Sequence, residues 1–310
     1  MVSVVIPNYN GIAHLPTCLA ALRAQTYTPF EVLLVDNAST DESVACARRA
    51  FDGIRIVTLA ANRVFAGAAN EGIRAARGEI IALLNNDTEA EPSWLSELVA
   101  SLLQEPEAGM AASKMRLFDR RDALHNAGDG FGRNGLPVNR GARLTDQGQF
   151  DGDHFVFSAC GGAAAYRRAM LDQIGLFDED FVAYCEDVDL GWRAQLAGWR
   201  CVYAPRAIVY HKLSATGGGA LSSYFVGRNV IWVMAKNLPA RLWRKYWRRI
   251  LGAQAQVTLD ALKAWRGEAA RARLRGQLAG LTGLPRVLRK RRAIQVARRV
   301  SDAYLETVLS

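Results

Sequence analysis

The chain has 310 residues, of which 50% are hydrophobic, with 39 Lys and Arg against 30 Asp and Glu and a formal net charge of +9. This composition excludes a disordered chain and supports one large folded unit with an appended segment. No run approaches the roughly 18 apolar residues of a membrane-spanning helix. The N-terminus opens on an apolar run without the pattern of a secretory leader. The five cysteines lack metal-type spacing, so we expect reduced thiols in a cytoplasmic protein.

The charge is unevenly distributed along the chain. Residues 240–310 hold 17 Lys and Arg against 4 Asp and Glu, a net of +13, whereas residues 1–239 hold 22 against 26, a net of −4. The basic character therefore belongs to the C-terminal segment. This asymmetry predicts that the segment meets an anionic partner.

The first hundred residues alternate between apolar runs and helical patterns. The predicted strands cover residues 2–6, 32–35, 54–59 and 80–84. The predicted helices cover residues 14–25, 39–49, 66–76 and 92–104, the second opened by a capping box of Ser39 and Glu42. Strands without polar alternation, separated by helices, favour a mostly parallel sheet covered on both faces.

The rest of the chain is less regular. Residues 117–153 are rich in Gly, Asn, Asp and Arg with little periodicity, which predicts a long loop region. Order returns over residues 155–166, with a helix beginning near Arg167, and residues 175–211 are dense in aromatic and acidic side chains. After Ala220 helical patterns dominate, with breaks near Pro239 and Pro285.

Polar side chains follow three of the predicted strands. They are Asn8, Asn10, Asp36, Asn37, Asn85, Asn86 and Asp87. In an open parallel sheet, ligands bind beyond the carboxyl ends of the strands. Short polar and acidic groups there suit a divalent cation held with a diphosphate, and Asp36 suits a base or ribose. The alternatives are a simple turn at residues 85–87 and local helix capping at Asp36.

A second acidic group, Glu186-Asp187-Val188-Asp189, lies among aromatic residues. A carboxyl in such surroundings has a raised pKa and can act as a general base. The alternative is a helix N-terminus, which favours acids because of the helix dipole. Asp189 and Arg193 have the spacing of a helical ion pair. We therefore assign that pair to structure and keep Glu186 and Asp187 as candidates for chemistry.

Two further features have both a functional and a structural interpretation. His211 ends a predicted strand, and imidazole suits transition metals such as Mn, although a lone His can equally be structural. The Gly-rich residues 216–219, followed by Tyr224, Arg228 and Asn229, form either a lid with Arg228 as a phosphate clamp or a plain linker.

The basic C-terminal segment carries aromatic residues among its cations. Trp243, Tyr246 and Trp247 alternate with Arg and Lys, and residues 286–292 form a second basic run. This pattern suits the interface of an anionic membrane. A solvated helical face or an oligomer contact are the alternatives. Nucleic acid is disfavoured because no common binding motif is present.

These motifs, in this order, resemble the family-2 group of inverting glycosyltransferases, in particular the rhamnosyltransferase-like branch that builds bacterial surface polysaccharides. The motifs are VVIPNYN at residues 4–10, VDNASTD at 35–41, the segment 62–70, LLNNDT at 83–88, GLFDE at 175–179, EDVD at 186–189, His211 and residues 224–229. The resemblance implies an α/β GT-A fold with a mostly parallel, mixed sheet flanked by helices. Residues 1–110 would bind the nucleotide sugar, residues 111–235 the acceptor, and residues 236–310 would form a basic helical extension.

The resemblance also implies roles for single residues. The donor would contact Pro7, Asn8, Asn10, Asp36, Asn62, Gly67, Asn70, Asn86 and Arg228. Asp87, helped by His211 and Asn85, would bind Mg or Mn, although Asn85 stands where the strict family motif has Asp. Asp187, with Glu186 beside it, would be the catalytic base. The acceptor-side loop would contain Gly161 and Gly162.

The resulting prediction is an enzyme that moves rhamnose or another hexose from a nucleoside-diphosphate sugar to a glycan or lipid-linked acceptor. It would work at the inner face of the cell membrane, by a single displacement that inverts the anomeric carbon. A nucleotidyltransferase is one alternative, but residues 7–11 carry no basic side chain to grip a triphosphate. The other alternative is an inactive membrane-surface scaffold, and the acidic residues at 87, 186 and 187 argue against it. Oligomeric state is left open.

Overall fold

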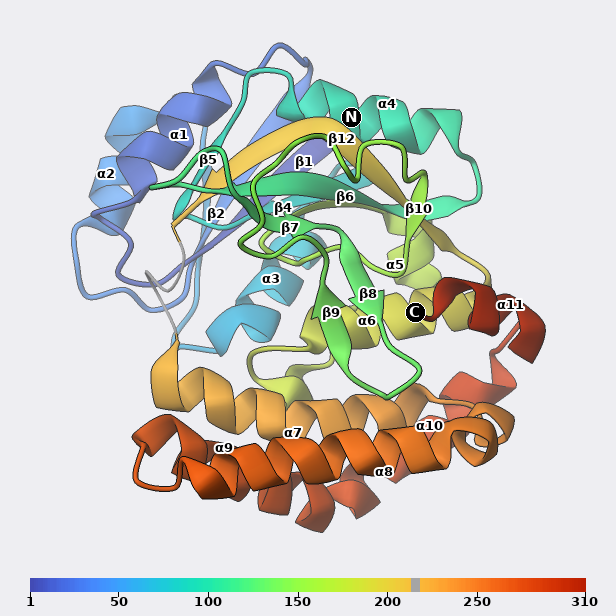
Figure 1. The fold of residues 1–310 in the computed structure, drawn as a ribbon. Helices are drawn as coiled ribbons and strands as arrows, with labels where there is room; N and C mark the ends of the chain where they lie inside the picture. The colour runs from blue at the N-terminus through green and yellow to red at the C-terminus, as the bar shows by residue number, and fades with distance from the viewer. Residues whose placement is uncertain (213–217) are drawn as a thin grey trace.

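The computed structural model describes residues 1–212 and 218–310, and shows a helix-covered sheet above a separate helical layer (Figure 1). The strands of the sheet are β1 (Val2–Asn8), β2 (Phe30–Asp36), β3 (Arg55–Thr58), β4 (Ile80–Leu84), β5 (Thr88–Ala90), β6 (Ala108–Leu117), β7 (Leu124–Ala127), β10 (Phe155–Val156), β11 (Ala163–Arg167) and β12 (Arg200–His211). Their order is β10-β12-β6-β11-β4-β1-β2-β3, with β5 beside β12 and β7 beside β6. The predicted α/β class with a mixed, mostly parallel sheet is confirmed.

The N-terminal half is a run of parallel strands. β1 pairs with β2 and β4, and β2 pairs with β3, all in parallel. The helices of this half are α1 (Leu15–Arg23), α2 (Ser43–Ala50), α3 (Val64–Ala75) and α4 (Trp94–Gln104). Side chains of β1 alternate between the two faces, so Val4 and Ile6 pack with α1 and α4, whereas Val5 packs with α3. Because both faces are buried, these strands are continuous apolar runs in the sequence.

The second half completes the sheet and supplies the acidic segment. β11 is antiparallel to its neighbours β4 and β6, and β12 runs parallel to β6. This half also contains α5 (Arg168–Ile174), the 3₁₀ turn η1 (Glu179–Phe181) and α6 (Glu186–Ala197). A short hairpin of β8 (Asp129–Phe131) and β9 (Pro137–Asn139) reaches from the sheet towards the helical layer (Figure 1).

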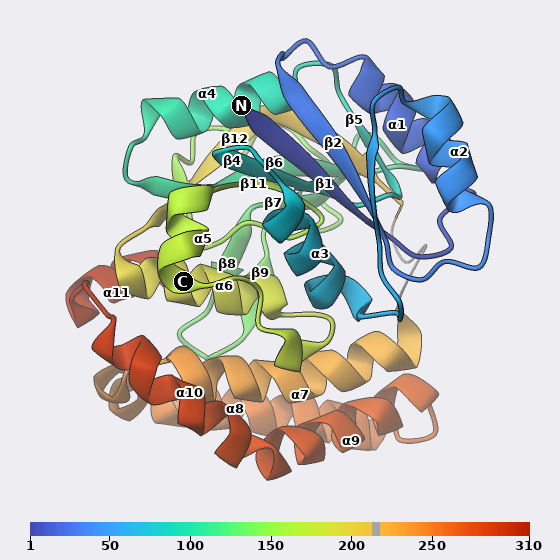
Figure 2. The same ribbon diagram turned by 180° about the vertical axis from the view of Figure 1, so that it is seen from behind.

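The C-terminal helices form the layer below the sheet (Figures 1 and 2). They are α7 (Gly219–Asn237), α8 (Ala240–Lys263), α9 (Glu268–Thr282), α10 (Leu284–Val296) and α11 (Asp302–Val308). The predicted breaks are confirmed, since α8 begins directly after Pro239 and Pro285 lies in the first turn of α10. Leu242 and Val287 of this layer share one apolar core with Phe131 and Trp192 of the body. Among the described residues, no helix is long and apolar enough to cross a membrane.

Two local predictions are wrong. Residues 117–153 are not one long loop, because they contain β7 and the β8–β9 hairpin, whose strands of three or four residues are too short to show periodicity. Ser39 does not open a helix, since α2 begins at Ser43 and has no side-chain cap. The Ser39 hydroxyl instead accepts hydrogen bonds from the Asn10 amide at 3.0 Å and from Nδ2 of Asn8 at 3.3 Å.

Candidate active site

The ends of β1 and β4 are held together by two asparagines. Nδ2 of Asn86 donates to Oδ1 of Asn8 at 2.7 Å, and both side chains are buried. Gly11 lies against this pair: a Cβ there would come within 2.1 Å of Asn8 Oδ1 and 2.2 Å of Asn86 Nδ2. The chain after β1 therefore folds over the strand ends only because residue 11 has no side chain.

The loops after β1, β2 and β3 are bonded to one another at the same edge. Asp36 is opposite Asn8 in the register of β1 and β2. Its Oδ1 accepts from the Ser39 amide at 3.2 Å, which is a bond within the loop and not a helix cap. Oδ1 of Asn10 accepts from the Thr40 amide at 2.8 Å. Oδ1 of Asn62 accepts from the Asn37 side chain at 2.9 Å. These contacts join the three loops into one polar rim, made of Asn8, Asn10, Asp36, Asn37, Asn62 and Asn86.

Asp87 and His211 meet beside this rim. The end of β12 pairs with β5, so His211 is opposite Thr88. Nε2 of His211 lies 3.2 Å from Oδ1 of Asp87. Within residues 1–212 and 218–310, that buried carboxylate oxygen accepts no hydrogen bond. A buried, unsatisfied carboxylate oxygen next to an imidazole nitrogen is a donor set that fits a divalent cation.

His125 of β7 is the part of this site that the sequence did not reveal. Its Nδ1 lies 3.1 Å from Nδ1 of His211, and the two ring centroids are 4.8 Å apart. Burial, and then the neighbouring His211, lower the pKa of His125 to about 3, against a smaller opposing effect of Asp87. His125 is thus neutral and fixes the orientation of the His211 ring. Its place in a segment without periodicity left no signal in the sequence.

The turn at Gly161 and Gly162 connects the metal-side residues to the acidic group. The Asn85 amide donates to the Gly162 carbonyl at 2.8 Å, and the Gly161 amide donates to Oδ2 of Asp187 at 3.0 Å. A Cβ on Gly161 would lie 3.2 Å from the Phe65 ring, which is closer than a side chain normally packs. The turn of Gly161 and Gly162 therefore joins Asn85, on the predicted metal side, to the predicted base Asp187.

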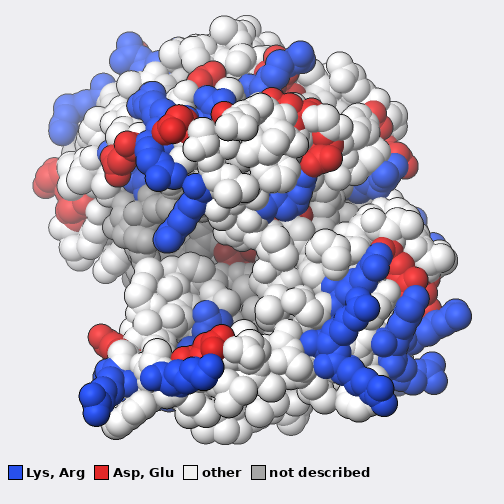
Figure 3. Space-filling model, viewed as in Figure 1, with Lys and Arg blue, Asp and Glu red and all other residues white. Residues whose placement is uncertain are grey.

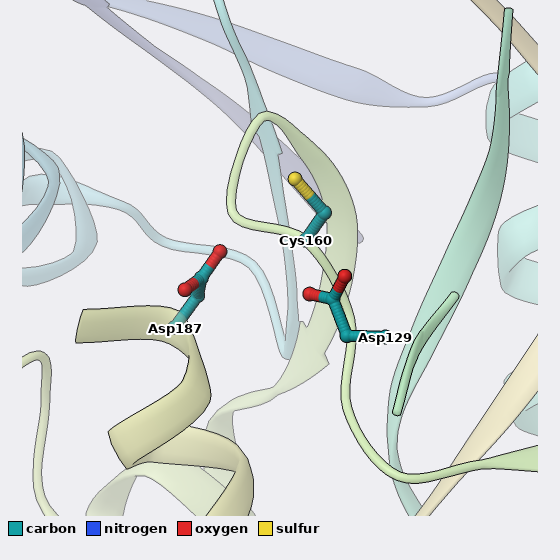
Figure 4. Close-up of side chains that lie close together, drawn as sticks. All are labelled: Asp129, Cys160 and Asp187. Atoms are coloured by element: carbon teal, nitrogen blue, oxygen red, sulfur yellow. The ribbon is translucent and has the colours of Figure 1, made fainter. Parts of the chain in front are cut away.

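Asp187 lies in a cluster with Asp129 of the β8 strand and with Cys160 (Figure 4). Ligand atoms of the three side chains lie within 4.8 Å of one another. Burial raises the pKa of Asp187, although the Gly161 and Val188 amides oppose it. Burial, and then Asp187, raise the pKa of Asp129 to about 8. With a pKa of about 8, Asp129 is protonated at neutral pH beside Asp187.

Glu186 is more deeply placed than Asp187. It is buried, and burial followed by the charge of Asp187 raises its pKa well above the ordinary range. Its Oε2 has no hydrogen-bond partner among the described residues. Asp187, in contrast, is only half-buried and bonds to the Gly161 loop. Of the two predicted catalytic acids, Asp187 has the exposure that proton transfer to a substrate requires.

The loop before α6 is strained and is held by α7. Val182, Tyr184 and Cys185 have positive φ values of 67°, 66° and 66°. Nδ2 of the fully buried Asn229 donates to the carbonyls of Phe181, Ala183 and Tyr184 at 2.6 to 2.9 Å. Backbone strain of this kind persists only where the surroundings impose it. Asn229 is that restraint.

The predicted phosphate lid covers residues 216–219 and the first part of α7. Thr216 and Gly217 lie outside the described residues, and Gly219 is already the first residue of α7. Arg228 donates to the carbonyls of Asp180 and Phe181 at 3.0 and 2.7 Å, and to Asn229 at 2.8 Å. Its guanidinium therefore holds η1, and its contact with a donor phosphate stays a prediction.

Two other predicted donor contacts have structural partners. Asn70 of α3 donates to the Phe177 carbonyl at 2.9 Å and accepts from the Phe177 amide at 3.0 Å. A Cβ on Gly67 would lie 2.6 Å from Cβ of Arg63, at the first turn of α3. Asn70 thus joins α3 to the segment before η1 by hydrogen bonds, and Gly67 leaves room for the Arg63 side chain.

The predicted Asp189–Arg193 ion pair is confirmed, with Nε of Arg193 2.9 Å from Oδ2 of Asp189. Asp189 also accepts from Lys236 and Asn237 of α7, each at 2.8 Å. A fully buried carboxylate is tolerated because these partners compensate its charge. This network fixes α6, and hence Asp187, against α7.

Some basic residues of the C-terminal helices form ion pairs with acidic residues of the segment before α6. Arg286 of α10 pairs with Asp180, and Nζ of Lys290 lies 2.6 Å from Asp178. Tyr246 of α8 is buried in the core of the layer, so it does not belong to an exposed aromatic face as predicted. The remaining Lys and Arg gather on the surface of the layer, most densely over the end where α8 begins (Figure 3).

A sheet of this topology, with a polar rim at its strand ends and a carboxylate group facing it, is the architecture of GT-A glycosyltransferases. Residues 3–175 match the family described as Glycosyl transferase family 2, and the chain belongs to that family. It is a glycosyltransferase.

Two relatives and one solved structure illustrate the likeness. The O-antigen biosynthesis protein RfbC of Myxococcus xanthus is 34% identical over 69% of this chain, which spans only 17% of that protein. The N-acetylglucosaminyl-diphospho-decaprenol L-rhamnosyltransferase of Mycobacterium tuberculosis is 28% identical over 78% of this chain and 86% of its own length. The mannosyltransferase PcManGT of Pyrobaculum calidifontis, in complex with GDP-Man and Mn2+, shares the fold with a TM-score of 0.57 and 19% identity, over 99% of this chain and 82% of that chain.

Proposed function

We propose that this glycosyltransferase moves rhamnose or another hexose from a nucleoside-diphosphate sugar to a lipid-linked or glycan acceptor of a bacterial surface polysaccharide, with inversion. The observation that carries the proposal is the Gly161–Gly162 turn, which bonds Asn85 on the metal side and Asp187 on the acid side. A base and a leaving-group site are thereby held on either side of one short turn. The relative that acts on a decaprenyl diphosphate sugar supports the acceptor class.

The polar rim is the donor site in this proposal. Pro7, Asn8, Asn10, Asn62 and Asn86 shape it. Oδ2 of Asp36, which makes no hydrogen bond within the described residues, is left for the base or ribose of the nucleotide. Gly67, Asn70 and Arg228 act indirectly, because their contacts hold α3 and η1 in place.

Asp87 and His211, with the neighbouring Asn85, would hold Mg or Mn. When bound, the cation supplies positive charge beside the leaving diphosphate. The solved mannosyltransferase with Mn2+ supports this assignment. Asp87 is the single acid of the triplet at residues 85–87, so the imidazole of His211 contributes the second protein ligand.

Asp187 is the general base. Its carboxylate takes the proton of the acceptor hydroxyl while that oxygen attacks the anomeric carbon. The bond from this carbon to the diphosphate oxygen breaks, and the nucleoside diphosphate leaves from the opposite face. Family membership favours this reaction over the nucleotidyl transfer considered from the sequence.

The test is a transfer assay with dTDP, UDP and GDP sugars and an N-acetylglucosaminyl diphosphate isoprenoid, with the product anomer assigned by NMR. Asp187→Asn should lower kcat by about 10²-fold or more, whereas Asp52→Asn at an exposed position should not. Chelation should abolish transfer and remove the thermal stabilisation by nucleoside diphosphate, and Mn should restore both. Full transfer by Asp187→Asn, or full activity after chelation, contradicts the proposal.

We also propose that α8 lies on an anionic membrane surface. Its exposed apolar residues recur at helical spacing along one side. They are Trp243, Trp247, Leu251, Leu259 and Leu262, exposed by 39, 44, 51, 50 and 50%. Arg244 and Arg248 are exposed beside them. Interfacial tryptophan with flanking arginine suits the headgroup region of a bilayer.

A further inference from the structure

A groove lies between the β8–β9 hairpin and helices α7, α8 and α9. Its volume is about 410 Å³. Most of its lining is apolar. The apolar residues include Leu136, Val226, Val230, Val257, Ala261 and Ala269. A groove of this size and character takes a hydrocarbon group with few polar contacts.

One cation lines this groove without a counter-charge. Arg273 of α9 is partly buried, and burial lowers its pKa. Within residues 1–212 and 218–310, its side chain has neither a carboxylate nor a hydrogen-bond partner. The acid in the lining, Asp260, is exposed and lies near Lys263 and Gln256 instead. A desolvated guanidinium without an anion is costly, so the groove is suited to an anionic ligand.

The groove lies against the loop before α6. Its lining residues Leu136, Val226 and Val230 belong to the same apolar cluster as Cys185 of that loop. Cys185 is two residues from the base Asp187. A Cβ on Gly227 of α7 would lie 2.8 Å from the Arg273 carbonyl and 3.1 Å from its Cδ. The absence of this side chain lets α9 bring Arg273 close to the strained loop before α6.

Helix α8 both lines the groove and has an exposed apolar surface. Val257 and Ala261 line the groove, while Leu259 and Leu262 of the same helix are each 50% exposed. We expect the end of a chain longer than the groove to extend along α8 towards the proposed membrane face. A ligand with an apolar chain in the groove, an anionic group at Arg273 and a hydroxyl at Asp187 meets all three requirements. An isoprenoid diphosphate sugar is such a molecule.

We propose that this groove binds the isoprenoid chain of a lipid-diphosphate acceptor, with Arg273 bound to its diphosphate and the sugar directed to Asp187. The inference rests on the proposed function, because it names where the lipid part of the acceptor binds. Arg273 is then an acceptor ligand that is independent of the donor rim and of Asp87.

The first test is binding, measured by calorimetry with geranylgeranyl diphosphate as the probe. We expect the wild type to bind the probe, and Arg273→Gln to bind it about tenfold or more weakly, as for a lost charge-assisted hydrogen bond. Arg275→Gln, exposed on the same helix, is the matched control. Inorganic diphosphate and geranylgeraniol, each alone, should bind much more weakly than the probe. Equal binding of the probe by wild type and Arg273→Gln overturns the inference.

The second test separates this inference from the proposed function. In the transfer assay, Arg273→Gln and the groove-filling Ala269→Trp should raise KM for the lipid acceptor at least about tenfold. The donor KM should not change. A wild type that binds the probe at Arg273 but transfers no sugar refutes the proposed function and leaves the groove supported. Normal acceptor KM in both variants refutes the groove and leaves the function intact.

Discussion

At the residue scale, Asp187 and Asp129 are two carboxyl groups in one buried cluster with different tasks. Burial raises the pKa of both, and Asp187 adds to the effect on Asp129. A general base acts only when it is deprotonated, so the raised pKa of Asp187 moves the acid limb of the pH–rate profile to higher pH. We therefore expect kcat to fall as pH decreases through a value above the ordinary range of Asp, near 3.9.

Asp129 gives a second inflection that can be checked separately. Its pKa of about 8 predicts a change in rate at alkaline pH, where it ionises beside Asp187. Asp129→Asn mimics the protonated side chain, so it should keep activity at pH 7 and remove the alkaline inflection. A pH–rate profile of both proteins measures this. An unchanged alkaline inflection in Asp129→Asn would show that another group titrates there.

The candidate site was only partly predictable from single residues. Asp36, Asp87 and His211 were found because each follows an apolar strand, where a parallel sheet exposes its ligands. His125 and Asp129 were missed. Their strands, β7 and β8, are four and three residues long, too short to show periodicity. Their contacts with His211 and Asp187 join positions far apart in the chain and depend on the tertiary fold, which local patterns do not encode.

At the element scale, the parallel half of the sheet and its helices followed from apolar periodicity, whereas the role of α7 did not. Its sequence suggested a lid or linker, yet Asn229 and Arg228 bond the carbonyls of η1 and the loop before α6. Those partners are more than forty residues away in the chain. A buried amide that satisfies distant carbonyls has no sequence signature.

We expect Asn229→Ala to destabilise the protein by about 2 kcal/mol, because three buried carbonyls lose their donor. The loop before α6 should loosen and misplace Asp187, so kcat should fall while the donor KM stays unchanged. Urea unfolding and steady-state kinetics measure the two effects. Asn139→Ala in exposed β9 is the control. If kcat stays normal after the loss of stability, Asn229 is a packing residue alone.

The exposed face of α8 makes a prediction of its own. Replacing Trp243 and Trp247 by Ser should weaken binding to vesicles with anionic lipid about tenfold or more, because two interfacial apolar groups are lost. Binding of the wild type should also weaken with salt, since Arg244 and Arg248 contribute electrostatically. Vesicle flotation measures both. Leu103→Ser, 65% exposed on α4, is the matched control. Equal flotation of the double variant would remove α8 from the membrane interface.

At the scale of the whole molecule, the sheet and the helical layer form one unit with the active site at their junction. Figures 1 and 2 show α6 between the sheet and α7. Phe131 and Trp192 of the body pack with Leu242 and Val287 of the layer. The sequence marked residues 236–310 by their charge, which suggested an appendage. The structure shows that ion pairs and a shared core join this segment to the body.

Lys236 is the central cation of that junction. Its Nζ lies 2.6 Å from Asp178 and 2.8 Å from Asp189, and Lys290 adds a second contact to Asp178. Burial alone would raise the pKa of both acids, but Lys236 holds them below their ordinary range. A carboxyl whose pKa is lowered in the folded state stabilises that state at pH values above its unfolded pKa of about 3.9. This stabilisation is lost as pH falls through the pKa of the folded state. The junction should therefore weaken in acid.

Lys236→Met tests this directly. It leaves two buried carboxylates short of a counter-charge, so we expect a loss of about 3 kcal/mol in unfolding free energy at pH 7. As pH falls below about 5, the variant should lose less stability than the wild type. Protonating Asp178 and Asp189 costs the wild type their attraction to Lys236, which the variant already lacks. Urea unfolding across pH measures both effects, with the exposed Lys263→Met as control. A loss below about 1 kcal/mol, the range of a surface ion pair, would mean that the shared apolar core alone joins the layer to the body.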